Sequence, residues 1–128
     1  MKTRLLPLFL LCCLQAFSAD WPHWLGPNRD GTSIENKWKS EINDPVWKTQ
    51  VGVGFSAVSV ANGKVFTLGH DGKKNGGKET VYCLNAQTGK SIWKHSYDAP
   101  LIDYLHEGGP CASPAVDGEI LYTISKHG

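Results

Sequence analysis

The feature that most constrains the fold is a loop of small and polar residues between two short β-rich runs, spanning residues 84–93. Gly89 lies near the end of this loop. Glycine adopts a positive φ without a Cβ penalty, as a three- to five-residue hairpin loop with a bulge requires. The sequence therefore predicts a β-hairpin, and we expect Trp93 in its second strand to be buried.

Two further patterns occur twice in the chain. The triplet centred on Trp47, Val-Trp-Lys, recurs 46 residues later as Ile-Trp-Lys around Trp93. Residues 56–68, two β-rich runs joined through Asn-Gly, align without a gap with residues 112–124, an offset of 56. Asn-Gly between such runs is a strong hairpin signal. Internal repetition of short strands at this spacing is typical of propeller blades.

Both faces of the expected strands are largely apolar. Val65 and Thr67 alternate with Phe66 and Leu68, so neither face of that strand is polar. Such a sheet requires cover on both sides, which stacked blades supply and a sheet with one solvated face does not. A two-sheet sandwich is the alternative architecture.

Two motifs resemble quinoprotein-type (PQQ-like) β-propellers of the superfamily that includes BamB-type outer-membrane assembly factors. Ala86-x-Thr88-Gly89-x-x-x-Trp93 resembles their repeat. Residues 21–31, Trp-Pro-His-Trp-Leu-Gly-Pro-Asn-Arg-Asp-Gly, resemble the opening of secreted members, although Leu25 stands where an arginine is expected. The resemblance implies an all-β fold of antiparallel four-stranded blades. About one and a half blades would be present, so we expect a fragment, with the strand of Trp47 completing the last blade.

The chain divides into three expected parts. Residues 1–19 have a basic start, an apolar run and small residues before the cleavage zone, as in a secretory signal peptide; an uncleaved anchor is the alternative. Residues 20–44 form an extended arm, with loop over 32–44. Residues 45–128 form the partial propeller repeat region, beginning with a short strand at 45–51. We therefore expect a periplasmic or extracellular protein with no membrane span after signal cleavage.

Charge excludes one class of partner. Without Lys2 and Arg4 the chain keeps 11 basic residues against 12 acidic ones, a net charge near −1. No basic stripe remains, so nucleic-acid binding has no electrostatic basis.

The cysteines leave two interpretations open. Cys12 and Cys13 belong to the predicted signal peptide, so this vicinal pair, a feature of some PQQ enzymes, carries no catalytic weight here. Cys83 and Cys111 would either form a disulfide in an oxidising compartment or remain separate thiols.

No motif predicts a catalytic or metal site. Residues 72–78 match G-x-x-x-x-G-K, but Glu79 and a following strand replace the Ser/Thr and helix of a phosphate loop. There is no Gly-x-Ser-x-Gly elbow for a serine nucleophile. The histidines are scattered at positions 23, 70, 95, 106 and 127, without metal-ligand spacing, and are expected at the surface or at strand ends. Polar residues around Gly108 mark a long loop where propeller sites commonly lie: Asp98, Asp103, His106 and Glu107.

These observations predict a non-catalytic β-propeller segment that acts as a binding or scaffold platform for an unidentified protein or small-molecule ligand. The structural repeat motif comprises Trp47, Ala86, Thr88, Gly89 and Trp93. Trp21 and Trp24 are expected to be buried where the N-terminal arm packs across a sheet domain; an aromatic ligand platform is the alternative. The resemblance also permits a fragment of a PQQ-dependent alcohol or sugar dehydrogenase. PQQ and calcium are expected only in a full-length enzyme.

Overall fold

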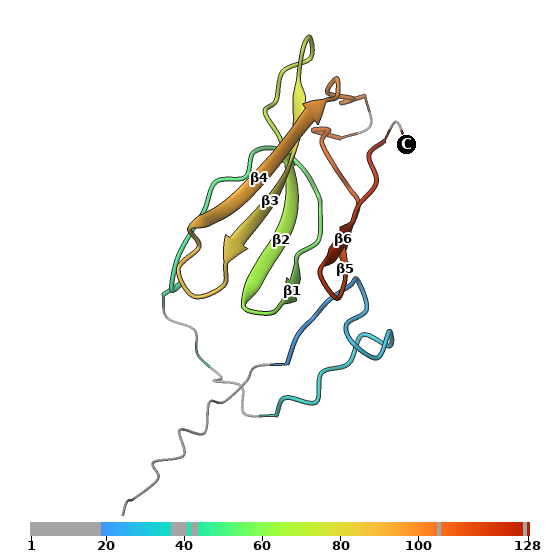
Figure 1. The fold of residues 1–128 in the computed structure, drawn as a ribbon. Helices are drawn as coiled ribbons and strands as arrows, with labels where there is room; N and C mark the ends of the chain where they lie inside the picture. The colour runs from blue at the N-terminus through green and yellow to red at the C-terminus, as the bar shows by residue number, and fades with distance from the viewer. Residues whose placement is uncertain (1–18, 37–40, 42–43, 105, 127) are drawn as a thin grey trace, which may run out of the picture.

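The computed structural model describes residues 19–36, 41, 44–104, 106–126 and 128 (Figure 1). These residues form six strands and no helix, so the prediction of an all-β fold with antiparallel sheets is confirmed. The predicted signal peptide lies, apart from Ala19, outside the described residues.

Four strands form the larger sheet as an antiparallel meander in the order β1-β2-β3-β4. Its strands are β1 (Ser59–Ala61), β2 (Lys64–His70), β3 (Lys78–Asn85) and β4 (Ser91–Asp98). A second sheet contains only the hairpin of β5 (Ala115–Asp117) and β6 (Ile120–Tyr122). Figure 1 shows this hairpin beside β1, where the N-terminal part of the chain also passes.

The predicted turn chemistry is confirmed in the two hairpins of the larger sheet. Asn62 and Gly63 join β1 to β2 with φ of 52° and 70°, as a two-residue turn with both central residues left-handed requires. Gly89 has φ of 67° in the loop between β3 and β4. That loop is organised by Asn85, whose Oδ1 accepts hydrogen bonds from the backbone N–H groups of Gln87 and Thr88.

The repeat predicted at an offset of 56 residues is present at the level of strand register. Ser59 pairs with Phe66 between β1 and β2, and Ala115 pairs with Tyr122 between β5 and β6. The other two pairs of each hairpin keep the same offset. The two stretches therefore fold as equivalent hairpins.

The core lies between the two sheets. Phe66, Cys83 and Ala61 form a buried cluster on one face of the larger sheet, and Val116 and Leu121 of the β5–β6 hairpin pack against them. All of β2 after its first residue is buried, whereas β3 is fully buried at alternate positions and at Leu84. The two central strands thus have cover on both faces, as their apolar composition predicts.

The other face is crossed by the segment between Trp47 and Val53. A Cβ added at Gly69 of β2 would lie 1.7 Å from the backbone oxygen of Val51, so the two backbones touch. Val53 then pairs with His70, taking the edge of β2 that the short β1 leaves open. The strand predicted at residues 45–51 is wrong: this segment packs across the sheet instead of joining its ladder. The first of the two β-rich runs within residues 56–68 forms a strand only from Ser59.

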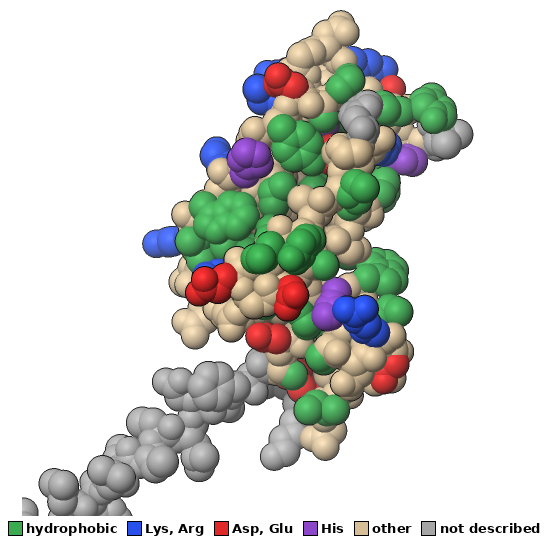
Figure 2. All heavy atoms as spheres, turned by 45° about the vertical axis from the view of Figure 1, so that its right-hand side comes forward, with side chains coloured by type: hydrophobic (Ala, Val, Ile, Leu, Met, Phe, Trp, Pro, Cys, Tyr) green, Lys and Arg blue, Asp and Glu red, His purple; other side chains and the backbone are tan. Residues whose placement is uncertain are grey.

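The prediction that Trp93 is buried is also wrong. Its side chain is 41% exposed, and Ile92 beside it is exposed as well. Trp93 contacts Phe66 with ring centroids 6.2 Å apart, but β4 is the edge strand and nearly all of its residues are exposed. Figure 2 shows hydrophobic side chains gathered across the middle of one face, with charged groups around them. Cover on both faces therefore does not extend to β4.

Candidate ligand-binding pocket

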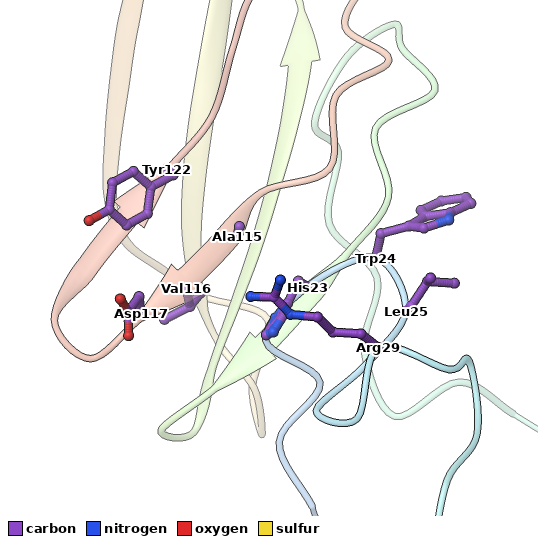
Figure 3. A pocket seen from close by; sticks show the side chains of 8 residues that line it. All are labelled: His23, Trp24, Leu25, Arg29, Ala115, Val116, Asp117 and Tyr122. Carbon is purple, nitrogen blue, oxygen red and sulfur yellow. The ribbon is translucent and has the colours of Figure 1, made fainter.

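A cavity of about 520 Å³ lies between the N-terminal arm and the β5–β6 hairpin, and we call it the arm cavity (Figure 3). Its walls come from residues far apart in the sequence: His23, Trp24, Leu25, Arg29, Ala115, Val116, Asp117 and Tyr122. Its size lies in the range of small-molecule sites, which combine an apolar lining with a few convergent polar groups.

Backbone hydrogen bonds hold the arm against both hairpins. Trp21 exchanges two hydrogen bonds with Val60 of β1, with N···O distances of 2.8 and 2.9 Å. The next carbonyl, that of Pro22, accepts a 2.8 Å hydrogen bond from the N–H of Val116 in β5. The arm therefore connects the two equivalent hairpins and fixes one wall of the cavity relative to the other.

Two successive turns then bring Arg29 back toward the cavity. Gly26 donates its N–H to the carbonyl of His23, and Arg29 donates to the carbonyl of Gly26. Gly26 packs against the ring of Trp21, where an added Cβ would lie 2.7 Å from a ring carbon. Arg29 has φ of 58°, a left-handed conformation that residues with a Cβ adopt at an energetic cost.

The charged groups of the cavity are not paired with each other. Arg29 and Asp117 both line it, yet neither forms an ion pair with any described residue. Figure 3 shows the guanidinium of Arg29 directed from the arm toward β5. Both ring nitrogens of His23 are buried without a hydrogen-bond partner in the described part of the chain. Buried polar atoms in folded proteins are almost always hydrogen-bonded, so such an exception requires an explanation.

The apolar lining is accessible from outside. Trp24 is 66% exposed, so its predicted burial is wrong, and Tyr122 is 52% exposed. Trp21, not Trp24, is the half-buried tryptophan of the arm, and its ring packs against Gly26. The alternative of an aromatic ligand platform in this segment stays a prediction for Trp24.

Four of the five residues of the structural repeat motif meet at the loop between β3 and β4: Trp47, Ala86, Thr88 and Gly89. The indole Nε1 of Trp47 donates a 2.9 Å hydrogen bond to the carbonyl of Ala86, and the ring lies over Gly89. The hydroxyl of Thr88 donates to the side chain of Asn85 within the loop. Trp93 lies elsewhere, in the wall of a second cavity of about 430 Å³ between the sheets. The motif is therefore a packing feature around Gly89.

The polar residues of the long loop do not converge on one site. Asp98 pairs with Lys78 at 2.7 Å, and Asp103 pairs with Lys74 at the same distance. The Lys74 hydrogen bond holds the pKa of Asp103 below its usual value. His106 contacts the ring of Phe55 and accepts a hydrogen bond from Gly108. Glu107 is exposed in the same loop.

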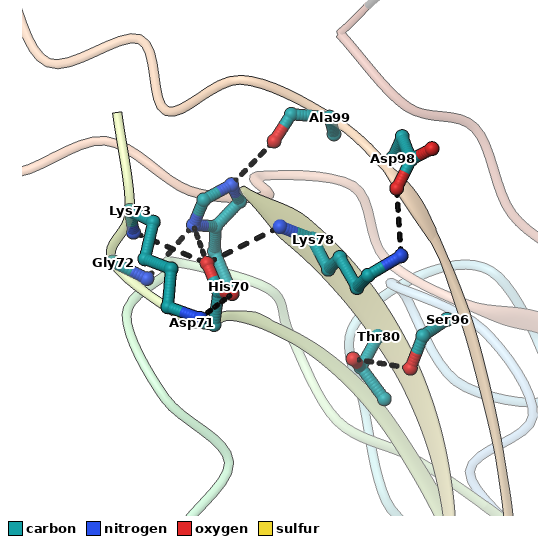
Figure 4. A network of polar contacts seen from close by, with 9 residues as sticks. All are labelled: His70, Asp71, Gly72, Lys73, Lys78, Thr80, Ser96, Asp98 and Ala99. Carbon is teal, nitrogen blue, oxygen red and sulfur yellow. Dashed lines mark hydrogen bonds and ion pairs between the residues drawn. The ribbon is translucent and has the colours of Figure 1, made fainter. Parts of the chain in front are cut away.

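His70 has a structural role that its sequence context did not indicate. It is only 3% exposed at the end of β2 (Figure 4). Nδ1 accepts a 2.9 Å hydrogen bond from the N–H of Gly72, so Nε2 carries the proton and donates to the carbonyl of Ala99 at 2.7 Å. His70 thereby joins the β2–β3 loop to the segment after β4. Residues 71–77 form that loop and lead into strand β3 at Lys78, consistent with the exclusion of a phosphate loop.

Cys83 and Cys111 are both free thiols, which favours the second interpretation of the cysteines. Cys83 is buried in β3, and burial raises the pKa of its thiol, whereas Cys111 is exposed. Among the described residues, no three His, Cys, Asp or Glu side chains are grouped closely enough to hold a metal ion. Within the same residues, no helix long and apolar enough to cross a membrane is found.

Sequence reasoning found only part of the arm cavity. It singled out residues 21–31 as a motif and aligned Tyr122 with Phe66, but it did not bring Arg29 and Asp117 together. Comparisons with known proteins found no match: no family model, curated protein or solved structure is significantly similar to the chain. Membership of the PQQ-like family therefore stays a prediction.

Proposed function

We propose that the chain is an exported segment of a PQQ-like β-propeller that acts as a non-catalytic binding platform, with the arm cavity as its ligand site. The observation that carries the proposal is the cavity itself. Arg29 of the arm and Asp117 of β5 line one open cavity, and their charged groups are not paired with each other or with another described residue. Charged groups that have no partner within the protein are available to a ligand.

The repeated hairpin register supports the propeller part of the proposal. β1–β2 and β5–β6 share one register at an offset of 56 residues, and side chains of the second hairpin pack on a face of the first sheet. Successive blades of a propeller are repeated antiparallel units around a central axis. In this arrangement the arm would connect two blades, and its cavity would lie at their junction.

A cavity-filling variant of the full chain tests the binding site. Ala115 lines the cavity from β5, and Ala115→Phe places a ring into that space. The matched control, Gln87→Phe, adds the same group at an exposed position of the β3–β4 loop. Binding is measured by ligand-observed NMR with a library of small aromatic, carboxylate and amine fragments.

We expect some fragments to bind the parent chain and the Gln87→Phe variant but not the Ala115→Phe variant. The thermal unfolding midpoint of each variant checks that its fold is retained, and Trp24→Ala, at an exposed position, serves as a second lining variant. The proposal is wrong if no fragment binds, or if neither Ala115→Phe nor Trp24→Ala weakens the binding of the fragments.

A further inference from the structure

We propose that the arm cavity selects a zwitterion: an α-amino acid with an apolar side chain, bound through its carboxylate at Arg29 and through its ammonium group at Asp117. This inference rests on the proposed function and names the ligand class of the same site. The charges of the cavity, the unpartnered ring of His23, the backbone of Arg29 and the apolar lining all point to this ligand class.

The charge arrangement gives the first argument. A cation and an anion line one cavity, and neither pairs with the other or with another described residue. A ligand with a single charge would satisfy one of these groups and approach the like charge of the other. A ligand that carries both signs satisfies both, and the guanidinium of Arg29 suits a carboxylate because its N–H groups match two oxygens.

His23 supplies the second argument. Its ring nitrogens are buried and lack a partner within the described residues, and the side chain lines the same cavity as Arg29. A neutral imidazole has one donor and one acceptor. These nitrogens have almost no accessible surface, so the ring must turn toward the cavity before its donor can supplement Arg29 at a ligand carboxylate.

The backbone at Arg29 is the third argument. At its φ of 58°, glycine would be free of backbone strain, yet this position is occupied by an arginine. Strained backbone of this kind is concentrated at ligand sites, where the surrounding structure holds the side chain in place. Two turn hydrogen bonds, from Gly26 and from Arg29 itself, hold it here.

The rest of the lining suits an apolar side chain. Trp24, Leu25, Val116 and Tyr122 surround the charged groups, and Trp24 and Tyr122 are both exposed enough to contact a ligand. Aromatic rings provide a large contact area for an apolar group. The ligand class is therefore an amino acid with an aromatic or aliphatic side chain.

Three compounds with the same phenyl ring test this inference on the full chain: L-phenylalanine, 3-phenylpropanoate and 2-phenylethylamine. They carry both charges, the negative charge alone and the positive charge alone. We expect L-phenylalanine to bind roughly tenfold or more tightly than either analogue, because only it pairs with both side chains. Affinity is measured by titration with NMR or calorimetric detection.

Charge-neutralising variants assign each contact. Arg29→Gln should weaken the binding of L-phenylalanine and 3-phenylpropanoate roughly tenfold and leave 2-phenylethylamine unchanged. Asp117→Asn should weaken L-phenylalanine and 2-phenylethylamine roughly tenfold and leave 3-phenylpropanoate unchanged. Lys90→Gln and Glu119→Gln remove the same charges from exposed positions outside the cavity and serve as controls. Arg29→Gly provides a second test, because it removes the guanidinium without backbone strain.

The outcomes separate the two proposals. Fragments that bind in an Ala115-dependent manner, together with equal affinities for the three phenyl compounds, would overturn the zwitterion and leave the binding platform intact. Failure of every fragment and every phenyl compound to bind would overturn both. Preference for L-phenylalanine that survives Arg29→Gln, Arg29→Gly and Asp117→Asn would also contradict the assigned contacts.

Discussion

Replacing Gly89 by alanine should destabilise the protein through Trp47, a residue 42 positions earlier in the chain. A Cβ built at Gly89 would lie 2.4 Å from Cε3 and 2.5 Å from Cδ2 of the Trp47 ring, and 3.0 Å from the hydroxyl of Thr49. Carbon atoms in contact are about 3.5–4.0 Å apart, so the indole must move by about 1 Å or more.

The expected cost has three parts. The left-handed backbone, with φ of 67°, costs an alanine about 1 kcal/mol. Displacing the indole removes the hydrogen bond from Trp47 Nε1 to the carbonyl of Ala86, a net loss of about 1 kcal/mol. Exposing part of the ring, on the order of 40 Å², costs about 1 kcal/mol more. Gly89→Ala should therefore lower the free energy of unfolding by about 3 kcal/mol.

Gly63→Ala is the matched control. Gly63 has φ of 70°, and a Cβ there meets no atom within 4 Å, so only the backbone cost of about 1 kcal/mol applies. The two variants should differ by about 2 kcal/mol, or roughly 10 °C in the unfolding midpoint of a domain of this size. Urea and thermal unfolding are followed by circular dichroism. In a Trp47→Ala background, Gly89→Ala should cost no more than Gly63→Ala. The role of Trp47 would be contradicted if Gly89→Ala and Gly63→Ala lowered the free energy of unfolding equally in the parent chain. It would also be contradicted if their difference stayed the same in the Trp47→Ala background.

Three further predictions concern the buried polar groups. His70→Ala should cost about 2–4 kcal/mol in urea unfolding because two backbone partners lose their hydrogen bonds, whereas His95→Ala, at an exposed position, should cost little. Iodoacetamide should modify Cys111 but not Cys83 in the native protein, as read by peptide mass spectrometry; equal modification of both would contradict the structure. Burial raises the pKa of Cys83 above 9.0, and burial together with the carboxylate of Glu79 raises the pKa of Tyr97 above 10.0. Both folded pKa values exceed the unfolded ones, so the stability these groups contribute is complete below pH 9 and lost as the pH rises further. Cys83→Ala should therefore flatten the fall in urea midpoint between pH 8 and 10, and an unchanged slope would contradict this assignment.

Features set by short stretches of sequence were predictable. The Asn62-Gly63 turn depends on two residues that accept a positive φ, and the β3–β4 loop depends on Gly89 in the same way. The alignment of Val60 with Val116 was sufficient to predict equal hairpin registers, because register follows from the turn and from the alternation of side chains.

Features that depend on which element covers another were not predictable. Trp93 is a large aromatic residue in a strand, a type that is usually buried, but it lies on the edge strand β4 and remains partly exposed. Residues 45–51 have the composition of a strand, but both edges of β2 are already occupied, one by β3 and the other by β1 and Val53. The segment therefore has no open edge of β2 to pair with and crosses the face of the sheet.

Backbone preferences and side-chain periods within a few residues set the turns, the strand alternation and the repetition of one hairpin. In contrast, Arg29 and Asp117 are 88 positions apart and share the arm cavity only in the folded chain. Their proximity depends on the hydrogen bonds of Trp21 and Pro22 to two different hairpins. Backbone pairing of this kind involves groups that every residue carries, so the side-chain pattern does not reveal it.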